Sequence, residues 1–174
     1  FLLWYGSVDT ADTVDTADLS VVGDSTVASE QFGWTSRFVG DVDGDTIDDL
    51  VSSAWLAGTN NSGSAYLFLG GTTPTSVADA FASFGSTGTN DYTGIAVDGG
   101  DIDGDGLSDV LVTAYGRSSS AGAVGVWNAS VIAGGAEVID TDASVFITGS
   151  AADDLGYSAA MSPDLDGDGL ADLI

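Results

Sequence analysis

The sequence predicts an all-β fold made of β-propeller blades, and three observations support this prediction. An acidic loop recurs, beginning at Asp41, Asp101 and Asp164, which are 60 and 63 residues apart. Short apolar runs follow each loop, and turns rich in Gly, Ser, Asn and Asp separate them. About four strands per repeat of ~40 to 60 residues are typical of propeller blades. A β-solenoid or a tandem sandwich is the alternative architecture.

The apolar runs justify the strands in order along each repeat. The acidic loops are followed by "DLVSSAW" and "DVLVTAY", and then by "NNSGSAYLFLGG" and "SSAGAVGVWNAS". A further short run ends in glycine before each loop, as "LSVVG", "FASFG" and "VFITG". Runs of this length, rich in Val, Phe, Tyr and Leu, indicate strands, and no pattern predicts a long helix. One helical turn is expected around residues 77–80.

The repeats also predict the domain organisation. We expect residues 1–174 to form a single propeller segment, with repeats at about 24–85 and 86–149 and partial repeats at about 1–23 and 150–174. The initial "FLLWYG" aligns with "AYLFLG" in the third run of a repeat, and the final "DLI" aligns with the second run. We therefore expect about three blades from a larger propeller or repeat array. A subunit that completes its blades between chains is the alternative.

The charge balance excludes several function classes. The chain has 27 acidic residues against only Arg37 and Arg117, and it lacks Lys, His and Cys. A net charge of −25 argues against nucleic acid as a partner. No apolar run approaches the ~18 to 20 residues of a membrane span, so no membrane insertion is expected. Without His and Cys, the chain has no residues for the usual zinc sites or for Ser-His or Cys-His catalysis. Bound hard cations or a saline medium would offset the repulsion among its negative charges.

The acidic loops have the pattern D-x-D-x-D-x-x-x-D, which suits calcium. Calcium takes 6 to 8 oxygen ligands from carboxylates, backbone carbonyls and water. We expect up to three Ca²⁺ ions, one in each loop. The predicted carboxylate ligands occupy positions 1, 3, 5 and 9, and they are Asp41, Asp43, Asp45 and Asp49; Asp101, Asp103, Asp105 and Asp109; and Asp164, Asp166, Asp168 and Asp172. At position 7 the backbone carbonyls of Ile47, Leu107 and Leu170 are expected to point at the ion and their side chains into the core.

Other interpretations of these loops fit less well. An EF-hand needs a bidentate Glu at position 12 between two helices, but this position is Ser52 or Val112 and the flanking runs indicate strands. Magnesium prefers fewer protein ligands. Acidic turns that are merely solvated and bind no metal would not be expected to recur at the same place in three repeats. Position 6 is glycine in the second and third loops but Thr46 in the first, which predicts strain at the first site.

The segment "FGWTSRFVGDVDGDTIDDLVSSAW" and its copies resemble FG-GAP repeats, the blades of integrin α-subunit propellers and of many bacterial and archaeal surface proteins. The FG element is Phe32-Gly33 and Leu155-Gly156, with Tyr92-Thr93 in the middle copy; the GAP element survives as Ser53-Ala54-Trp55 and Thr113-Ala114-Tyr115. The resemblance implies a β-propeller with calcium in the loop joining the first two strands of a blade. It leaves the partner open.

These observations favour an extracellular or cell-surface module in which calcium is structural and which serves adhesion, surface structure or binding of a protein or glycan. A self-assembling filament and a secreted polysaccharide lyase or hydrolase are the alternatives. Because nearly every patterned Asp is assigned to calcium, we expect no enzyme.

Among the aromatic residues, Trp55 and Tyr115 are predicted to be the best exposed glycan contacts, and Trp4 and Trp127 to be core. Asn60 and Asn128 lie in N-glycosylation patterns.

Overall fold

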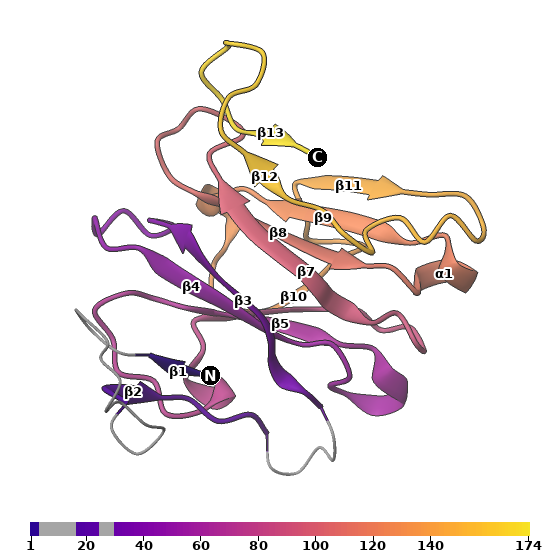
Figure 1. The fold of residues 1–174 in the computed structure, drawn as a ribbon, viewed down its shortest axis with the longest axis horizontal. Helices are drawn as coiled ribbons and strands as arrows, with labels where there is room; N and C mark the ends of the chain where they lie inside the picture. The colour runs from indigo at the N-terminus through magenta and orange to yellow at the C-terminus, as the bar shows by residue number, and fades with distance from the viewer. Residues whose placement is uncertain (4–16, 25–29) are drawn as a thin grey trace, which may run out of the picture.

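The computed structural model describes residues 1–3, 17–24 and 30–174, and this part of the chain is all-β (Figure 1). Its helical content is α1 (Arg117–Ser120) and three short 3-10 turns, Thr59–Asn61, Val77–Asp79 and Ala129–Val131. The all-β prediction is therefore confirmed, and the helical turn expected around residues 77–80 is present. The thirteen strands are β1 (Leu2–Leu3), β2 (Leu19–Ser20), β3 (Phe32–Gly40), β4 (Asp49–Ala54), β5 (Ser64–Phe68), β6 (Ala82–Gly85), β7 (Thr93–Gly100), β8 (Asp109–Ala114), β9 (Ala123–Trp127), β10 (Gly135–Val138), β11 (Val145–Thr148), β12 (Met161–Ser162) and β13 (Asp172–Leu173).

Two large sheets, antiparallel except for one parallel pair in the first, dominate the described structure. Their strand orders are β10-β6-β5-β4-β3 and β11-β9-β8-β7, and the pairs β1-β2 and β12-β13 form two small sheets. Within each large sheet, consecutive strands mostly pair with one another in antiparallel orientation, so the strand order mostly follows the sequence. Figure 1 shows the two large sheets beside one another, with β12 and β13 next to β7. The repeat boundaries themselves stay a prediction.

One strand departs from this order and joins the two repeats. β10 lies between β9 and β11 in sequence, yet it pairs in parallel with β6 of the preceding sheet, with Glu137 opposite Phe84. A smaller copy of this arrangement occurs near the N-terminus, where Val22 forms a parallel bridge with Ser76. There the Val22 N–H donates to the Thr75 carbonyl at 3.1 Å, and Val77 donates to the Val22 carbonyl at 3.0 Å. In both cases, a segment that precedes the last strand of one repeat pairs with the edge of the repeat before it: β10 with β6, and Ser76 with Val22.

Both faces of β8 are apolar, so a layer of core residues packs on each side of this strand. Val110 and Val112 belong to the main buried cluster, which includes Trp127, whereas Leu111 faces a second cluster that contains Met161. Successive side chains of a strand point to opposite faces, so this alternation places one packing layer on each side of the sheet. Trp127 is fully buried, as predicted, and Trp4 lies outside the described residues.

A β-bulge interrupts the first strand of each large sheet. The register shifts between Phe32 and Ser36 in β3, and between Thr93 and Val97 in β7. At the second bulge, the Ala96 N–H donates to the buried hydroxyl of Thr113 at 3.2 Å, and this hydroxyl donates to the Ala96 carbonyl at 3.3 Å. A side-chain hydroxyl therefore replaces ladder partners that the bulge removes.

Candidate metal centres

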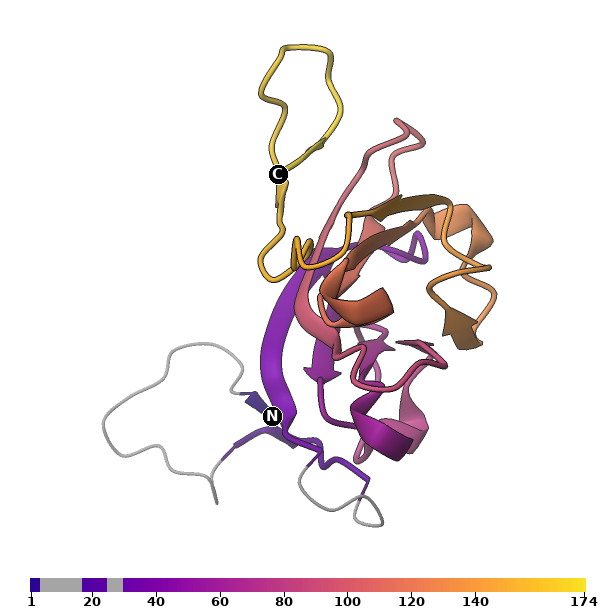
Figure 2. The same cartoon turned by 90° about the vertical axis from the view of Figure 1, so that its right-hand side faces the viewer.

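The three acidic loops occupy equivalent places in the fold. Residues 41–48 join β3 to β4, residues 101–108 join β7 to β8, and residues 163–171 join β12 to β13. Figure 1 shows these loops projecting from the same end of neighbouring strand pairs. Figure 2 shows the third loop extending away from the rest of the molecule, and its Leu165 is 69% exposed.

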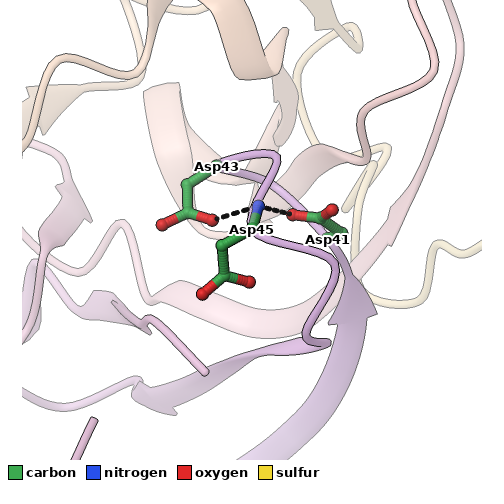
Figure 3. A group of neighbouring side chains, drawn as sticks. All are labelled: Asp41, Asp43 and Asp45. Atoms are coloured by element: carbon green, nitrogen blue, oxygen red, sulfur yellow. Dashed lines mark hydrogen bonds between the residues drawn. The ribbon is translucent and has the colours of Figure 1, made fainter. Parts of the chain in front are cut away.

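The aspartate at position 1 organises each loop. Asp41 accepts backbone N–H bonds from Gly44 at 2.7 Å, Asp45 at 3.1 Å and Thr46 at 2.8 Å. Asp101 and Asp164 accept the equivalent bonds from their own position 4 and position 6 residues. Figure 3 shows the Asp45 N–H between the carboxylates of Asp41 and Asp43. These bonds curl the backbone so that side chains from alternate positions face one another.

The aspartate at position 9 fastens the first two loops to the sheet. Asp49 is fully buried, and its two oxygens accept N–H bonds from Val42 at 2.8 Å and from Gly70 at 2.7 Å. Asp109 is also fully buried and accepts from Ile102 and Ala129 in the same way. Burial raises the pKa of both carboxyl groups, although these hydrogen bonds oppose the rise. In these two loops, position 9 therefore joins the loop to the residues that follow β5 or β9.

The structure brings a group of three carboxylates together in every loop. In each group, one carboxylate oxygen from every member lies within 4.8 Å of those of the other two. Positions 1 and 3 belong to all three groups, but the third member is position 5 in the first loop and position 9 in the other two. The groups are Asp41, Asp43 and Asp45; Asp101, Asp103 and Asp109; and Asp164, Asp166 and Asp172.

The remaining predicted carboxylates, Asp49, Asp105 and Asp168, lie outside these groups of three. The full ligand sets, with the carbonyls at position 7, stay predictions. An all-oxygen donor set with several carboxylates fits a hard cation such as calcium.

The side chains at position 7 correct one expectation. Ile47 is 46% exposed instead of lying in the core. Leu107 and Leu170 are partly buried, and they lie over the preceding loop: a Cβ at Gly44 would lie 3.5 Å from Leu107 Cδ2, and one at Gly104 would lie 3.0 Å from Leu170 Cδ2. The core expectation is therefore wrong for Ile47, whereas Leu107 also packs against the main core cluster as expected. Leu107 and Leu170 pack between loops, so their burial depends on the neighbouring repeat.

Sequence reasoning missed the apolar residue at position 2. Val42 is buried in the main cluster, and Ile102 packs against the second cluster. The signal was present, since position 2 is Val42, Ile102 or Leu165, an apolar residue between two aspartates in every loop.

Hydrogen bonds link each loop to the next. The Ser108 N–H donates to the Asp41 carbonyl at 2.8 Å, and the Ala171 N–H donates to the Asp101 carbonyl at 2.8 Å. Position 8 of one loop therefore binds position 1 of the loop before it. The Asn128 side-chain amide also donates to Asp103, which directs this predicted glycosylation site toward the second loop.

The backbone at position 6 has the expected left-handed conformation. Its φ is 90° at Gly106 and 94° at Gly169, and it is 72° at Thr46. A β-branched residue with this φ is a steric outlier. The strain predicted at Thr46 is therefore present in the backbone, whereas a weaker first metal site stays a prediction.

Comparison with known proteins agrees with this geometry. Residues 93–127 match the family model described as FG-GAP repeat. This range covers β7, the second acidic loop, β8 and β9. A search of curated proteins found no match. Among the described residues, no helix has the length and apolar character needed to cross a membrane. Residues 93–127 thus carry an FG-GAP repeat, the family whose repeats form β-propeller blades.

Proposed function

We propose that this chain is an extracellular β-propeller module that binds a protein or glycan partner and that uses calcium as a structural ion. The observation that carries the proposal is the recurrence, at one place in three consecutive repeats, of a group of three carboxylates that always includes positions 1 and 3. FG-GAP repeats occur in extracellular and surface proteins and serve as non-catalytic interaction modules, which supports the same class of function.

The electrostatics of the loops explain why calcium would stabilise the fold. Carboxylate oxygens held within 4.8 Å of one another repel in the folded chain, and an unfolded chain would separate them. A cation that binds only the folded form stabilises it, by about 2.7 kcal/mol per site when its concentration is 100 times Kd. Extracellular modules bind calcium with Kd values of about 10⁻⁴ to 10⁻³ M. The loops therefore suit a calcium-rich exterior.

Thermal unfolding of matched variants tests the calcium proposal. Asp103→Asn removes one carboxylate from the second group, whereas Asp48→Asn makes the same charge change at an exposed aspartate outside the groups. We expect calcium to raise the Tm of the wild type and of Asp48→Asn well above that in a chelator. We expect a clearly smaller rise for Asp103→Asn. Measurements at low and high NaCl separate site binding from charge screening.

Two outcomes would contradict the structural role of calcium. One is an equal calcium-dependent rise in Tm for both variants. The other is unfolding caused by low NaCl alone, with no effect of the chelator. Magnesium at the same concentration serves as the control cation, and we expect it to give a smaller rise in Tm.

The two alternatives stay predictions. Self-assembly by strand addition between chains predicts high-mass species in light scattering, whereas a monodisperse monomer would contradict it. A polysaccharide lyase or hydrolase predicts release of oligosaccharides from a polymer. The match to a non-catalytic repeat family fits a binding module better.

A further inference from the structure

Five aromatic rings form a continuous row across three repeats, which we call the aromatic strip: Trp34, Trp55, Tyr92, Tyr115 and Tyr157. Neighbouring ring centroids are 5.4 Å apart from Trp34 to Trp55 and 5.4 Å from Trp55 to Tyr92. The next steps are 5.2 Å to Tyr115 and 5.1 Å to Tyr157. The rings belong to β3, to the residues that follow β4 and β8, and to the segments before β7 and β12.

The strip lies at the opposite end of the strand pairs from the acidic loops. Each first strand begins near a strip residue and ends at an acidic loop, and each second strand returns from the loop toward Trp55 or Tyr115. Figure 1 shows β3 and β7 running side by side between these two ends. A substitution in the strip therefore leaves the carboxylate groups in place.

The strip is a surface feature and not part of the core. Trp34 is 55% exposed and Tyr157 is 66% exposed, whereas the core residue Trp127 is fully buried. The three central rings are partly exposed. The prediction that Trp55 and Tyr115 are the best exposed aromatic residues is therefore wrong, because both are only partly exposed and Trp34 and Tyr157 at the ends expose more surface. Contiguous exposed aromatic residues are typical of binding sites.

Uncharged amide side chains accompany the rings. Gln31 accepts a hydrogen bond from the Trp55 indole N–H at 2.9 Å. Asn61 donates to Asn90 at 3.1 Å, and the Asn61 carbonyl accepts the Tyr92 N–H at 3.2 Å. Amide groups both donate and accept hydrogen bonds, so they suit hydroxyl groups. The strip therefore combines apolar ring faces with neutral polar groups.

The charges near the strip select against anionic ligands. Asp153 and Asp154 are exposed just before Tyr157, whereas Asp91 before Tyr92 is buried. The chain as a whole carries a net charge of −25, so an anionic polymer would be repelled over its whole length. A neutral ligand incurs no such repulsion.

We propose that the aromatic strip binds a neutral glycan chain. Sugar rings have apolar C–H faces and polar hydroxyl edges, so the faces would pack on the aromatic rings while the hydroxyls bond to the amides. A row that crosses three repeats suits a linear polymer better than a single sugar. This inference rests on the proposed function as a binding module and names the chemical class of its partner.

The test uses the full chain in calcium and affinity electrophoresis in gels that contain one polymer each. The neutral probes are hydroxyethylcellulose, xyloglucan and galactomannan, the anionic probe is polygalacturonate, and poly-L-lysine represents a cationic partner. The variants are Trp34→Ala and Tyr157→Ala at the exposed ends of the strip. Phe38→Ala is the matched control, because Phe38 is a 58% exposed aromatic residue outside the strip.

We expect at least one neutral polymer to retard the wild type and the Phe38→Ala variant. We expect Trp34→Ala and Tyr157→Ala to weaken this binding at least tenfold while keeping the calcium-dependent rise in Tm. Binding to no neutral polymer, equal binding by all variants, or binding to poly-L-lysine alone would overturn the inference. Loss of the calcium-dependent rise with intact glycan binding would instead contradict only the calcium proposal.

Discussion

Thr46 occupies the position that glycine takes in the other two loops, and its φ of 72° is left-handed like theirs. The conformation is imposed by the Asp41 carboxylate, which accepts the Thr46 N–H at 2.8 Å, as Asp101 and Asp164 do with their glycines. A single side chain thus bends the backbone of each loop at the same residue. The sequence could predict this strain because two regular copies showed which residue type the position requires.

We expect Thr46→Gly to stabilise the folded chain by up to about 1 kcal/mol in saturating calcium. A left-handed conformation costs an L-residue roughly 1 to 2 kcal/mol, and glycine removes this cost. Glycine also loses more backbone entropy on folding, which offsets part of the stabilisation. Gly106→Thr, the reverse change in the second loop, should destabilise by a similar amount, up to about 1 kcal/mol, because a Cβ at Gly106 would meet no atom within 4 Å. Urea unfolding followed by tryptophan fluorescence, to which the buried Trp127 contributes, measures both changes. Equal midpoints for the wild type and both variants would contradict the argument.

At the scale of elements, the buried hydroxyl of Thr113 shows what the sequence could not reveal. The strands were predictable from their apolar runs, and the loops from their aspartates. The bulge in β7 was not, because register is a property of a strand pair and not of one run. Ser53 fills the same role in the other sheet, where it accepts the Thr35 N–H at 3.2 Å. A small hydroxyl residue at this place therefore serves the irregular strand beside it.

We expect Thr113→Val to destabilise the chain by about 1 to 3 kcal/mol, although valine has nearly the same shape. The change would leave the N–H of Ala96 without its buried partner, and an unsatisfied buried group costs about this much. Thr113→Ser keeps the hydroxyl and should lose only the smaller contribution of a methyl group. Chemical unfolding of the two variants side by side gives the comparison. A larger loss for the serine variant would show that packing, and not the hydroxyl, matters here.

At the scale of the whole molecule, the negative charge has few internal partners. Arg117 forms an ion pair with Asp140, and Arg37 donates to the Ser36 carbonyl. Three divalent cations would offset six charges, so most of the net charge of −25 would persist. Sequence alone predicted this imbalance, since it needs only a count. It could not predict the β6-β10 pairing, which joins residues of different repeats through backbone groups.

We expect NaCl to raise the Tm even in saturating calcium. Between 10 and 150 mM salt the Debye length falls from about 30 to about 8 Å, which screens repulsion between distant carboxylates. Differential scanning calorimetry across this range measures the effect, with sucrose of equal osmolality as the uncharged control. An equal rise in sucrose, or no dependence on NaCl, would show that long-range repulsion contributes little to stability.

The parallel pairing of β10 with β6 also determines where the array can be cut and rejoined. The sequence period suggests that blades could be exchanged at repeat boundaries. A cut before residue 86, however, would separate the sheet of β3–β6 from its outermost strand, β10. A transplantable unit that keeps its edge covered must extend through Val138 into the following repeat. Chimeras that add or exchange blades should therefore overlap their donor segments, because adjacent blades share backbone at each seam.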